Sequence, residues 1–384
     1  MIEKDRAGQD EHALGPWPDK ATAFAFLRFL AGRAAAPTAL TERLDPRALA
    51  RWLMDEDLTA LAYRRASSPL PALAARLQTA AFRAAAETGV VLSILDEIDA
   101  AAPPDLHLVA LKGAALALWA YPDPALRSML DLDLWLADGD MAAAQALLVD
   151  LGFADVDKAT RPRALQALAR GEVRFHHRRW VQGIVELHWS PLKGWWYSRA
   201  AAVDEAGIAA RSRPLGEGRR LERLAAEDMA IHVAAHLAIS DQFGVHVWRG
   251  LIDLALLPEV NWTVVAERAR TWRLATAVWA VMALLVEALD VDEARAAAEQ
   301  LRPGRARRWL LARYLAAAPL LAGRDWRQGR ARFALLLLLV DRRRDAARLI
   351  GRTLWPERTW LEARYGRPVG HVQHLWQVLR YGRV

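Results

Sequence analysis

The chain has 384 residues, of which 54% are hydrophobic and 25% are charged, and its formal net charge is +7. That length is too great for one small domain, so two or three compact units are expected. The chain has no cysteine, which excludes disulfides, thiolate metal sites and cysteine nucleophiles. A reducing cytoplasm is compatible with this composition and is the expected location.

The positive charge has two interpretations. Nearly all of the basic residues are arginines, since the chain contains only five lysines, and alanine is very abundant. A GC-rich genome favours arginine and alanine, and that bias alone would explain the charge. The alternative is a polyanionic partner such as RNA, which a basic surface attracts.

The N-terminal part of the chain is predicted to be helical. Residues 1–19 are polar and lack the apolar stretch of a signal peptide, so none is expected. From about Ala21 to Ala101, apolar residues recur at helical spacing. Pro103 and Pro104 then end the pattern, because proline lacks the backbone N–H that a helix needs.

Residues 104–222 have a different pattern of apolar and turn residues, which predicts a small α/β core. Short apolar runs bounded by turn residues indicate strands, and the segments between them indicate helices. The predicted order is β-α-β-α-β-β. The strands are expected at Leu106–Leu111, Asp131–Ala137, Glu172–Arg178 and Gly183–Trp189, and the helices at Ala114–Tyr121 and from Asp138 or Asp140 to Leu151.

The C-terminal part is predicted to be helical again from Ala225. The Arg- and Gly-rich segment 208–222 before it is either a linker or an edge hairpin. The longest apolar runs of the chain are shorter than the ~20 residues of a membrane span, so no membrane partner is expected. Helices are expected from Trp262 after a cap at Asn261, and at about 274–290, 292–303, 306–321 and 330–353, followed by a mixed tail to Val384.

Two carboxylates stand out in the strand that begins at Asp131. Asp131 and Asp133 are two residues apart, so on a strand their side chains point to the same face, about 7 Å apart. Two unpaired carboxylates side by side repel each other and resist burial. Mg²⁺ takes hard oxygen ligands and bridges carboxylates to phosphates. The pair therefore predicts a metal site, with two Mg²⁺ ions expected and Mn²⁺ as an alternative.

Residues upstream of this pair are candidates for binding a phosphate group. Gly113 lies where a strand turns into a helix, and the backbone N–H groups at a helix start favour a phosphate. Lys112 is expected to contact a phosphate oxygen as a point charge, and a surface lysine is the alternative. Arg127, in the loop before the acidic strand, offers a fork of donors to the same group.

A third carboxylate is expected from a neighbouring strand. Glu186 lies in the apolar segment Ile184–Trp189 and would be buried, so its charge needs a partner. It is either a third metal ligand or half of a salt bridge with an arginine such as Arg174. His188 lies on the same strand face, and His188 and Trp189 are candidate substrate contacts.

Other polar and aromatic residues carry weaker signals. His232 and His236 are four residues apart on a helix, but the HExxH pattern of a zinc site is missing, so packing or hydrogen bonding between helices is expected. Asp253 either pairs with an arginine, which we favour, or contacts substrate. Trp195 and Trp196 follow the Glu186 strand and are candidates to line a substrate pocket.

At this point a resemblance to a known family becomes visible. The segment LVALKGAALALWAYPDPALRSMLDLDLWL, followed later by IVELHW, resembles a family of bacterial nucleotidyltransferases with a polymerase-β-like fold. The likeness is strong over about residues 105–190 and weaker as far as WPERTWLEARYG. It implies a helix-rich α+β fold in which a nucleotidyltransferase core at 104–222 is flanked by helical regions at 1–103 and 223–384.

The wider superfamily has a Gly-Ser or Gly-Gly phosphate turn, an aspartate pair on the next strand and a third acid later. By that likeness Gly113 stands for the turn, Asp131 and Asp133 for metal ligands, and Glu186 for the third acid. The string KGA replaces the Gly-Ser turn in this chain, so no serine hydroxyl reaches the phosphate. The interval between the turn and the aspartates is also longer than usual.

The resemblance implies transfer of an NMP from an NTP such as ATP to an acceptor, with release of pyrophosphate. The acceptor is a small molecule, a peptide or protein, or RNA, and no motif distinguishes them. One alternative is a catalytically weak accessory protein for peptide or protein modification, which loss of the Gly-Ser turn favours. Another is a toxin-like enzyme acting on tRNA, which the positive charge favours.

Overall fold

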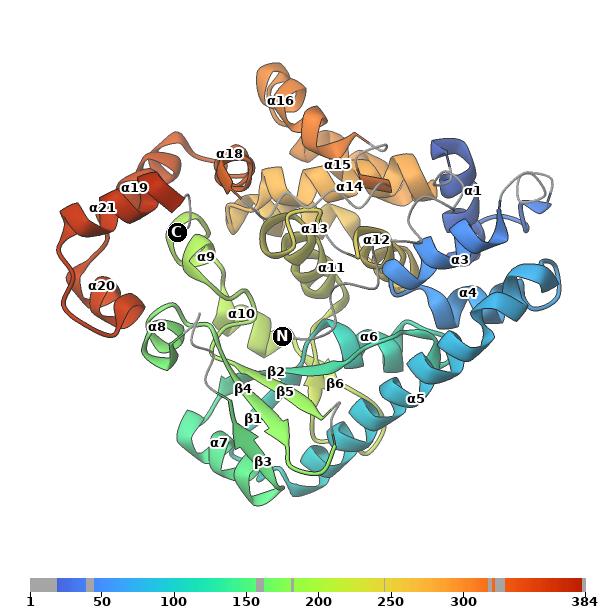
Figure 1. The fold of residues 1–384 in the computed structure, drawn as a ribbon, viewed down its shortest axis with the longest axis horizontal. Coiled ribbons are helices and arrows are strands. Elements are labelled where there is room, and N and C mark those ends of the chain that lie inside the picture. The colour runs from blue at the N-terminus through green and yellow to red at the C-terminus, as the bar shows by residue number, and fades with distance from the viewer. Residues whose placement is uncertain are drawn as a thin grey trace.

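A computed structural model of the chain confirms the helix-rich α+β class. Within the part of the chain that the structure describes, helices surround one mixed sheet of seven strands (Figure 1). Within the described residues, no helix is both long enough and apolar enough to cross a membrane. The structure describes residues 19–38, 45–156, 162–180, 183–244, 246–316, 320–321 and 329–381.

The helical N-terminal part is confirmed, whereas most of the expected polar start lies outside the described residues. Asp19 caps the first helix, because its side chain accepts a hydrogen bond from the Thr22 N–H. The longest helix, α5, runs along one face of the sheet (Figure 1). The helices are α1 (Lys20–Leu30), α3 (Pro46–Asp55), α4 (Thr59–Ala66) and α5 (Pro71–Ala101).

The sheet has the strand order β3-β4-β5-β2-β1-β7-β6. Four of its strands are the predicted ones, and β6 and β7 pair antiparallel, so the edge hairpin expected as one alternative near 208–222 is confirmed. The sequence pattern does not predict β3, because three residues are too few to show alternation. The strands are β1 (His107–Ala110), β2 (Asp131–Asp138), β3 (Phe153–Asp155), β4 (Glu172–His177), β5 (Ile184–His188), β6 (Arg213–Pro214) and β7 (Glu222–Arg223).

Two neighbouring strands at the middle of the sheet carry the candidate acids. β2 and β5 run parallel, and their register places Asp133 opposite Glu186 and Trp135 opposite His188. On the other side of β5, the antiparallel strand β4 places Arg174 opposite Glu186. Directly opposed residues of neighbouring strands project from the same face of a sheet. The register therefore gathers two acids and a cation on one face.

The helices of the core differ in detail from the prediction. α6 begins at Lys112, so Lys112 and Gly113 form the first turn of the helix rather than a turn before it. Asp140, one of the two residues expected to cap this helix, is the N-cap of α7. The sequence pattern does not predict three short helices, α8, α9 and α10. The bounds are α6 (Lys112–Trp119), η1 (Pro124–Leu126), α7 (Met141–Asp150), α8 (Arg163–Leu168), α9 (Trp195–Ala200) and α10 (Glu205–Arg211).

The C-terminal part is helical as predicted, and Asn261 caps α13. Between α11 and α12 the chain forms a π-helix, η2, followed by residues with positive φ, which the sequence pattern does not predict. The elements up to residue 315 are α11 (Ala226–Ala235), η2 (His236–Ser240), α12 (Val247–Leu256), α13 (Trp262–Thr271), α14 (Ala275–Leu289), η3 (Asp292–Ala294), α15 (Arg295–Leu301) and α16 (Arg305–Leu315).

The prediction of a single helix at 330–353 is wrong, because the helix is interrupted near Asp341, between Leu338 and Arg343. The Asp341 carboxylate accepts hydrogen bonds from the N–H groups of Ala275 and Thr276 at the start of α14. This contact between distant segments satisfies helix-end donors that have no partner within their own helix. The result is two helices and a helical tail: α18 (Gly329–Leu338), α19 (Arg343–Leu354), α20 (Arg358–Tyr365) and α21 (His371–Tyr381).

One hydrophobic cluster joins the N-terminal helices, the sheet and the C-terminal helices. The expected division into three units at 1–103, 104–222 and 223–384 therefore stays a prediction. A buried acid adds a polar tie across this core. Glu56, which follows α3, accepts a hydrogen bond from the Trp248 N–H at the start of α12, with 3.2 Å between nitrogen and oxygen.

Glu56 makes the stability of the protein depend on pH. Burial raises its pKa to about 8, against the opposing effect of the hydrogen bond from Trp248. The folded chain holds a proton that the unfolded chain loses near pH 4.5, so this group weakens stability as pH rises from about 4.5 to 8.

Glu56→Gln keeps the accepting oxygen and removes the titration. The melting temperature of the variant relative to wild type should therefore increase from pH 5 to pH 8, measured by thermal unfolding. An equal difference at both pH values would contradict this prediction.

Candidate active site

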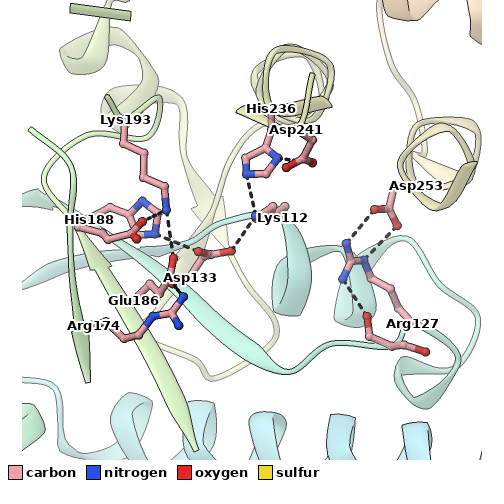
Figure 2. Close-up of polar contacts among 12 residues, drawn as sticks. Lys112, Arg127, Asp133, Arg174, Glu186, His188, Lys193, His236, Asp241 and Asp253 are labelled. Atoms are coloured by element: carbon pink, nitrogen blue, oxygen red, sulfur yellow. Dashed lines mark hydrogen bonds and ion pairs between the residues drawn. The ribbon is translucent and has the colours of Figure 1, made fainter. Parts of the chain in front are cut away.

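Three side chains from β2 and β5 meet on one face of the sheet. Asp133, Glu186 and His188 bring their ligand atoms within 4.8 Å of one another (Figure 2). They are 3%, 5% and 3% exposed, and His188 Nε2 lies 2.9 Å from Asp133 Oδ1. Two carboxylates and an imidazole are donors that hold divalent cations in proteins. The residues present therefore fit a metal ion.

Lys112 neutralises Asp133. Its ammonium nitrogen lies 3.3 Å from Asp133 Oδ2. Burial alone would raise the pKa of Asp133, but the Lys112 charge and the hydrogen bond with His188 hold it well below the usual value. Burial alone would lower the pKa of Lys112, but the carboxylates of Asp133 and Asp241 raise it. Both groups therefore stay charged at neutral pH.

A second set of contacts holds Lys112 from the side of the π-helix. The Lys112 ammonium lies 3.0 Å from His236 Nε2, and His236 Nδ1 lies 3.0 Å from the Asp241 carboxylate (Figure 2). The Lys112 ammonium can only donate hydrogen bonds, so His236 Nε2 accepts from it and His236 Nδ1–H donates to Asp241. The expected hydrogen bonding between helices is confirmed for His236. The sequence pattern does not indicate that its partner is the candidate site lysine, because η2 is not predictable locally.

His232, on α11, stands beside this network without a polar partner. It is 4% exposed, and neither ring nitrogen has a hydrogen-bond partner among the described residues. Burial lowers its pKa well below the usual value, so its ring is neutral. With Lys112 and His188 it lines a small cavity of about 10 Å³, the size of one water molecule. Buried ring nitrogens without a hydrogen-bond partner among the described residues therefore lie next to Lys112.

Two cations neutralise Glu186. An Arg174 guanidinium nitrogen contacts one carboxylate oxygen, and the Lys193 ammonium lies 3.1 Å from the other. Lys193 also contacts Glu172 (Figure 2). The salt bridge with Arg174 expected as one alternative is confirmed, and metal binding by Glu186 stays a prediction. The sequence pattern does not identify Lys193 or Glu172, because neither lies in a motif.

Asp131 lies on the same face as Asp133 but outside the group of three. It is half-buried, two residues earlier on β2 and opposite Ile184. Burial and the neighbouring charge of Asp133 raise the pKa of Asp131. Its expected role as a metal ligand stays a prediction.

Arg127 lies in a buried ion pair. It is 5% exposed, and its guanidinium donates two hydrogen bonds, of 3.0 and 2.8 Å, to the Asp253 carboxylate on α12. The Tyr121 hydroxyl donates to the same carboxylate at 2.8 Å. The pairing of Asp253 with an arginine is therefore confirmed. Figure 2 shows this pair apart from the Asp133 group, and the expected contact of Arg127 with a triphosphate stays a prediction.

Two further candidates are placed in packed surroundings. A Cβ added to Gly113 would lie 3.5 Å from Arg127 Nη1 and 3.7 Å from Met129 Sδ, which are ordinary contacts. The first turn of α6 thus packs against these side chains at Gly113. Trp189 is half-buried against the core, and its carbonyl oxygen accepts a hydrogen bond from Arg170. Phosphate binding at Gly113 and substrate contact at His188 and Trp189 stay predictions.

Arg127 and Asp253 should depend on each other for stability. Removing one partner of a buried pair leaves an uncompensated charge, so Arg127→Met should lower the free energy of unfolding by about 3–5 kcal/mol. The double variant Arg127→Met/Asp253→Leu should lose much less than the two single variants combined, measured by urea unfolding. Additive losses would show that the pair has no such coupling.

The group of Asp133, Glu186 and His188 predicts stabilisation by a divalent metal. Mn²⁺ or Mg²⁺ should raise the melting temperature, because a cation that binds only the folded form stabilises it. Asp133→Asn should abolish this rise. Asp138→Asn, at the exposed end of the same strand, is the matched control and should keep it. The readout is the shift on adding metal, and a full shift in Asp133→Asn would overturn the site.

Comparison with known proteins adds an independent finding. The model of a family described as "uncharacterised nucleotidyltransferase" matches residues 42–290, more than half of the chain. The match contains the whole sheet and α14, and with them every residue of the candidate site described above. Among curated proteins, none matches the chain.

Proposed function

The chain belongs to this family of uncharacterised nucleotidyltransferases, and from that premise we propose that it transfers an NMP from an NTP to an acceptor and releases pyrophosphate. The observation that carries the proposal is the buried group of Asp133, Glu186 and His188 beside Lys112. A chain that only needed a stable sheet would gain nothing from two carboxylates opposed across parallel strands.

The proposed metal ligands are Asp131, Asp133 and Glu186, whose oxygen atoms suit two Mg²⁺ ions or Mn²⁺. Bound there, the ions would neutralise charge on the triphosphate and on the leaving pyrophosphate. His188 orients Asp133 through its 2.9 Å hydrogen bond. Lys112, held in place by His236, offers its ammonium to a phosphate oxygen.

The chemical step forms one bond and breaks one. An acceptor hydroxyl oxygen bonds to the α-phosphorus, and the bond from that phosphorus to the bridging oxygen breaks. The electron pair leaves with pyrophosphate, and the acceptor proton passes to the Glu186 carboxylate, which acts as general base as the alternative to completing the metal site. Arg174 and Lys193 hold that carboxylate in position. Catalysis of this kind depends mainly on positioning and electrostatics.

A second candidate is a catalytically weak accessory protein for peptide or protein modification. The observation that favours it is the first turn of α6, where Lys112-Gly113-Ala114 takes the place of a Gly-Ser turn and packs against Arg127. The carboxylates are also neutralised by side chains of the chain itself.

The deciding experiment supplies Mg²⁺ or Mn²⁺ and each of four labelled NTPs, with cell extract as the source of acceptor. Pyrophosphate release and label transfer are measured. Wild type and Asp138→Asn should transfer label, and Asp133→Asn should be slower by about 100-fold or more.

Equal rates in Asp133→Asn and wild type would overturn the proposed site. Failure of every NTP to bind in the presence of metal would favour the accessory protein. The chemical nature of the labelled acceptor separates a small molecule, a peptide or protein, and RNA.

A further inference from the structure

A second, larger cavity opens next to the carboxylate group. Its volume is about 330 Å³, which is in the range of small-molecule sites. Residues of α8, α9, α18 and α20 line it. In Figure 1, α8 and α9 lie between the sheet and the C-terminal helices. Trp195 and Trp196, the sequence candidates for a substrate pocket, form part of the wall, and Trp360 adds a third indole.

The cavity adjoins the Glu186 side of the candidate active site. Lys193 lines the cavity, and its ammonium lies 3.1 Å from Glu186. Lys193, Tyr197 and Ser240 also line the 10 Å³ cavity next to Lys112. A molecule in the larger cavity would therefore have one end close to the carboxylate proposed to accept a proton.

The charge of the cavity favours an anion. Among the described residues, three cationic side chains line it, Lys193, Arg332 and Arg364, against one carboxylate, Glu172. Lys193 contacts two glutamates, Glu172 and Glu186, on the core side. Arg332 and Arg364 lie on α18 and α20, on the C-terminal side. A guanidinium binds carboxylates and phosphates with two parallel donors, so these helices offer a place for an anionic group.

Gln242 indicates a ligand independently of this charge. It lines the cavity and is 1% exposed, and its amide nitrogen donates to the Ile239 carbonyl at 3.1 Å. Its amide oxygen has no hydrogen-bond partner among the described residues. Gln242 and Phe243 have φ of +52° and +54°, a backbone conformation that residues other than glycine rarely adopt. Backbone strain of this kind concentrates at functional sites.

We infer that this cavity binds the acceptor, and that the acceptor is a small organic anion with a carboxylate or phosphate group and a hydrogen-bond donor. Arg332 and Arg364 bind the anionic group, the indoles contact the body of the molecule, and Gln242 accepts from its donor. The nucleophilic end lies toward Lys193 and Glu186. The inference rests on the proposed nucleotidyl transfer.

The nucleotide is the less suitable occupant of this cavity. Its triphosphate must reach Asp133 and Lys112, and neither of them lines the cavity. The arginines at α18 and α20 would then face the nucleoside end, which carries no charge. An acceptor with its anionic group at the arginines and its nucleophile at Glu186 matches the charges at both ends.

The test uses phenyl phosphate and benzoate as probes of the two anionic groups, and benzyl alcohol as the neutral analogue. Calorimetric titration should show binding of at least one anion to wild type and none of benzyl alcohol. Arg332→Ala/Arg364→Ala should weaken that binding at least tenfold. Arg295→Ala/Arg302→Ala removes the same charge from exposed ion pairs at the two ends of α15 and should bind like wild type.

A second titration measures ATP with Mg²⁺ or Mn²⁺. The Arg332→Ala/Arg364→Ala variant should bind ATP as wild type does, and ATP should not displace the anionic probe. Equal probe affinity in wild type and this variant, or displacement of the probe by ATP, overturns the inference. The single variant Arg332→Gln, at an exposed position of α18, gives the same comparison if the double variant fails to fold.

The two proposals fail in different ways. If ATP binds to no form of the protein, nucleotidyl transfer fails and the cavity loses its role as an acceptor site, whereas the probe titration still decides whether it is an anion site. If ATP binds and label transfer occurs but neither anion binds to wild type, only the inference about the acceptor fails.

Discussion

Asp133 and Glu186 face each other across a pair of parallel strands, and both are almost fully buried. Two such charges are costly to bury unless each has a close opposite charge. Lys112 supplies it to Asp133, and Arg174 and Lys193 supply it to Glu186. These cations come from α6, from β4 and from the segment after β5. The need to neutralise two acids thus fixes how three parts of the core pack around the sheet.

The same need explains the network behind Lys112. If a metal ion takes a share of the Asp133 charge, a lysine with only that partner would lose its stabilisation. His236 and Asp241 provide a second partner on the opposite side. The ammonium therefore keeps a negative neighbour whether or not Asp133 binds a cation. A cation held from two sides can also turn toward a phosphate without leaving a buried charge unpaired.

The sequence predicts the local part of this arrangement and not the distant part. The alternation in β2 and β5 identifies both strands, so Asp133, Glu186 and His188 could be found as residues of one face. The register that opposes Asp133 to Glu186 is a long-range pairing, and no local pattern determines it. For the same reason the sequence could not show that Lys193 reaches Glu186, or that the guanidinium of Arg127 is bound by a carboxylate of α12.

The family match covers only part of the wall of the larger cavity. The match ends at residue 290 and includes Asp133, Glu186 and His188, whereas Arg332, Trp360 and Arg364 lie beyond it. Chemistry resides in a site grafted on a fold, and specificity resides in the walls around that site. The proposed acceptor cavity therefore joins side chains inside the matched segment, such as Lys193 and Gln242, to side chains of α18 and α20 beyond it. If the cavity binds the acceptor as proposed, the C-terminal helices contribute Arg332 and Arg364 to its recognition.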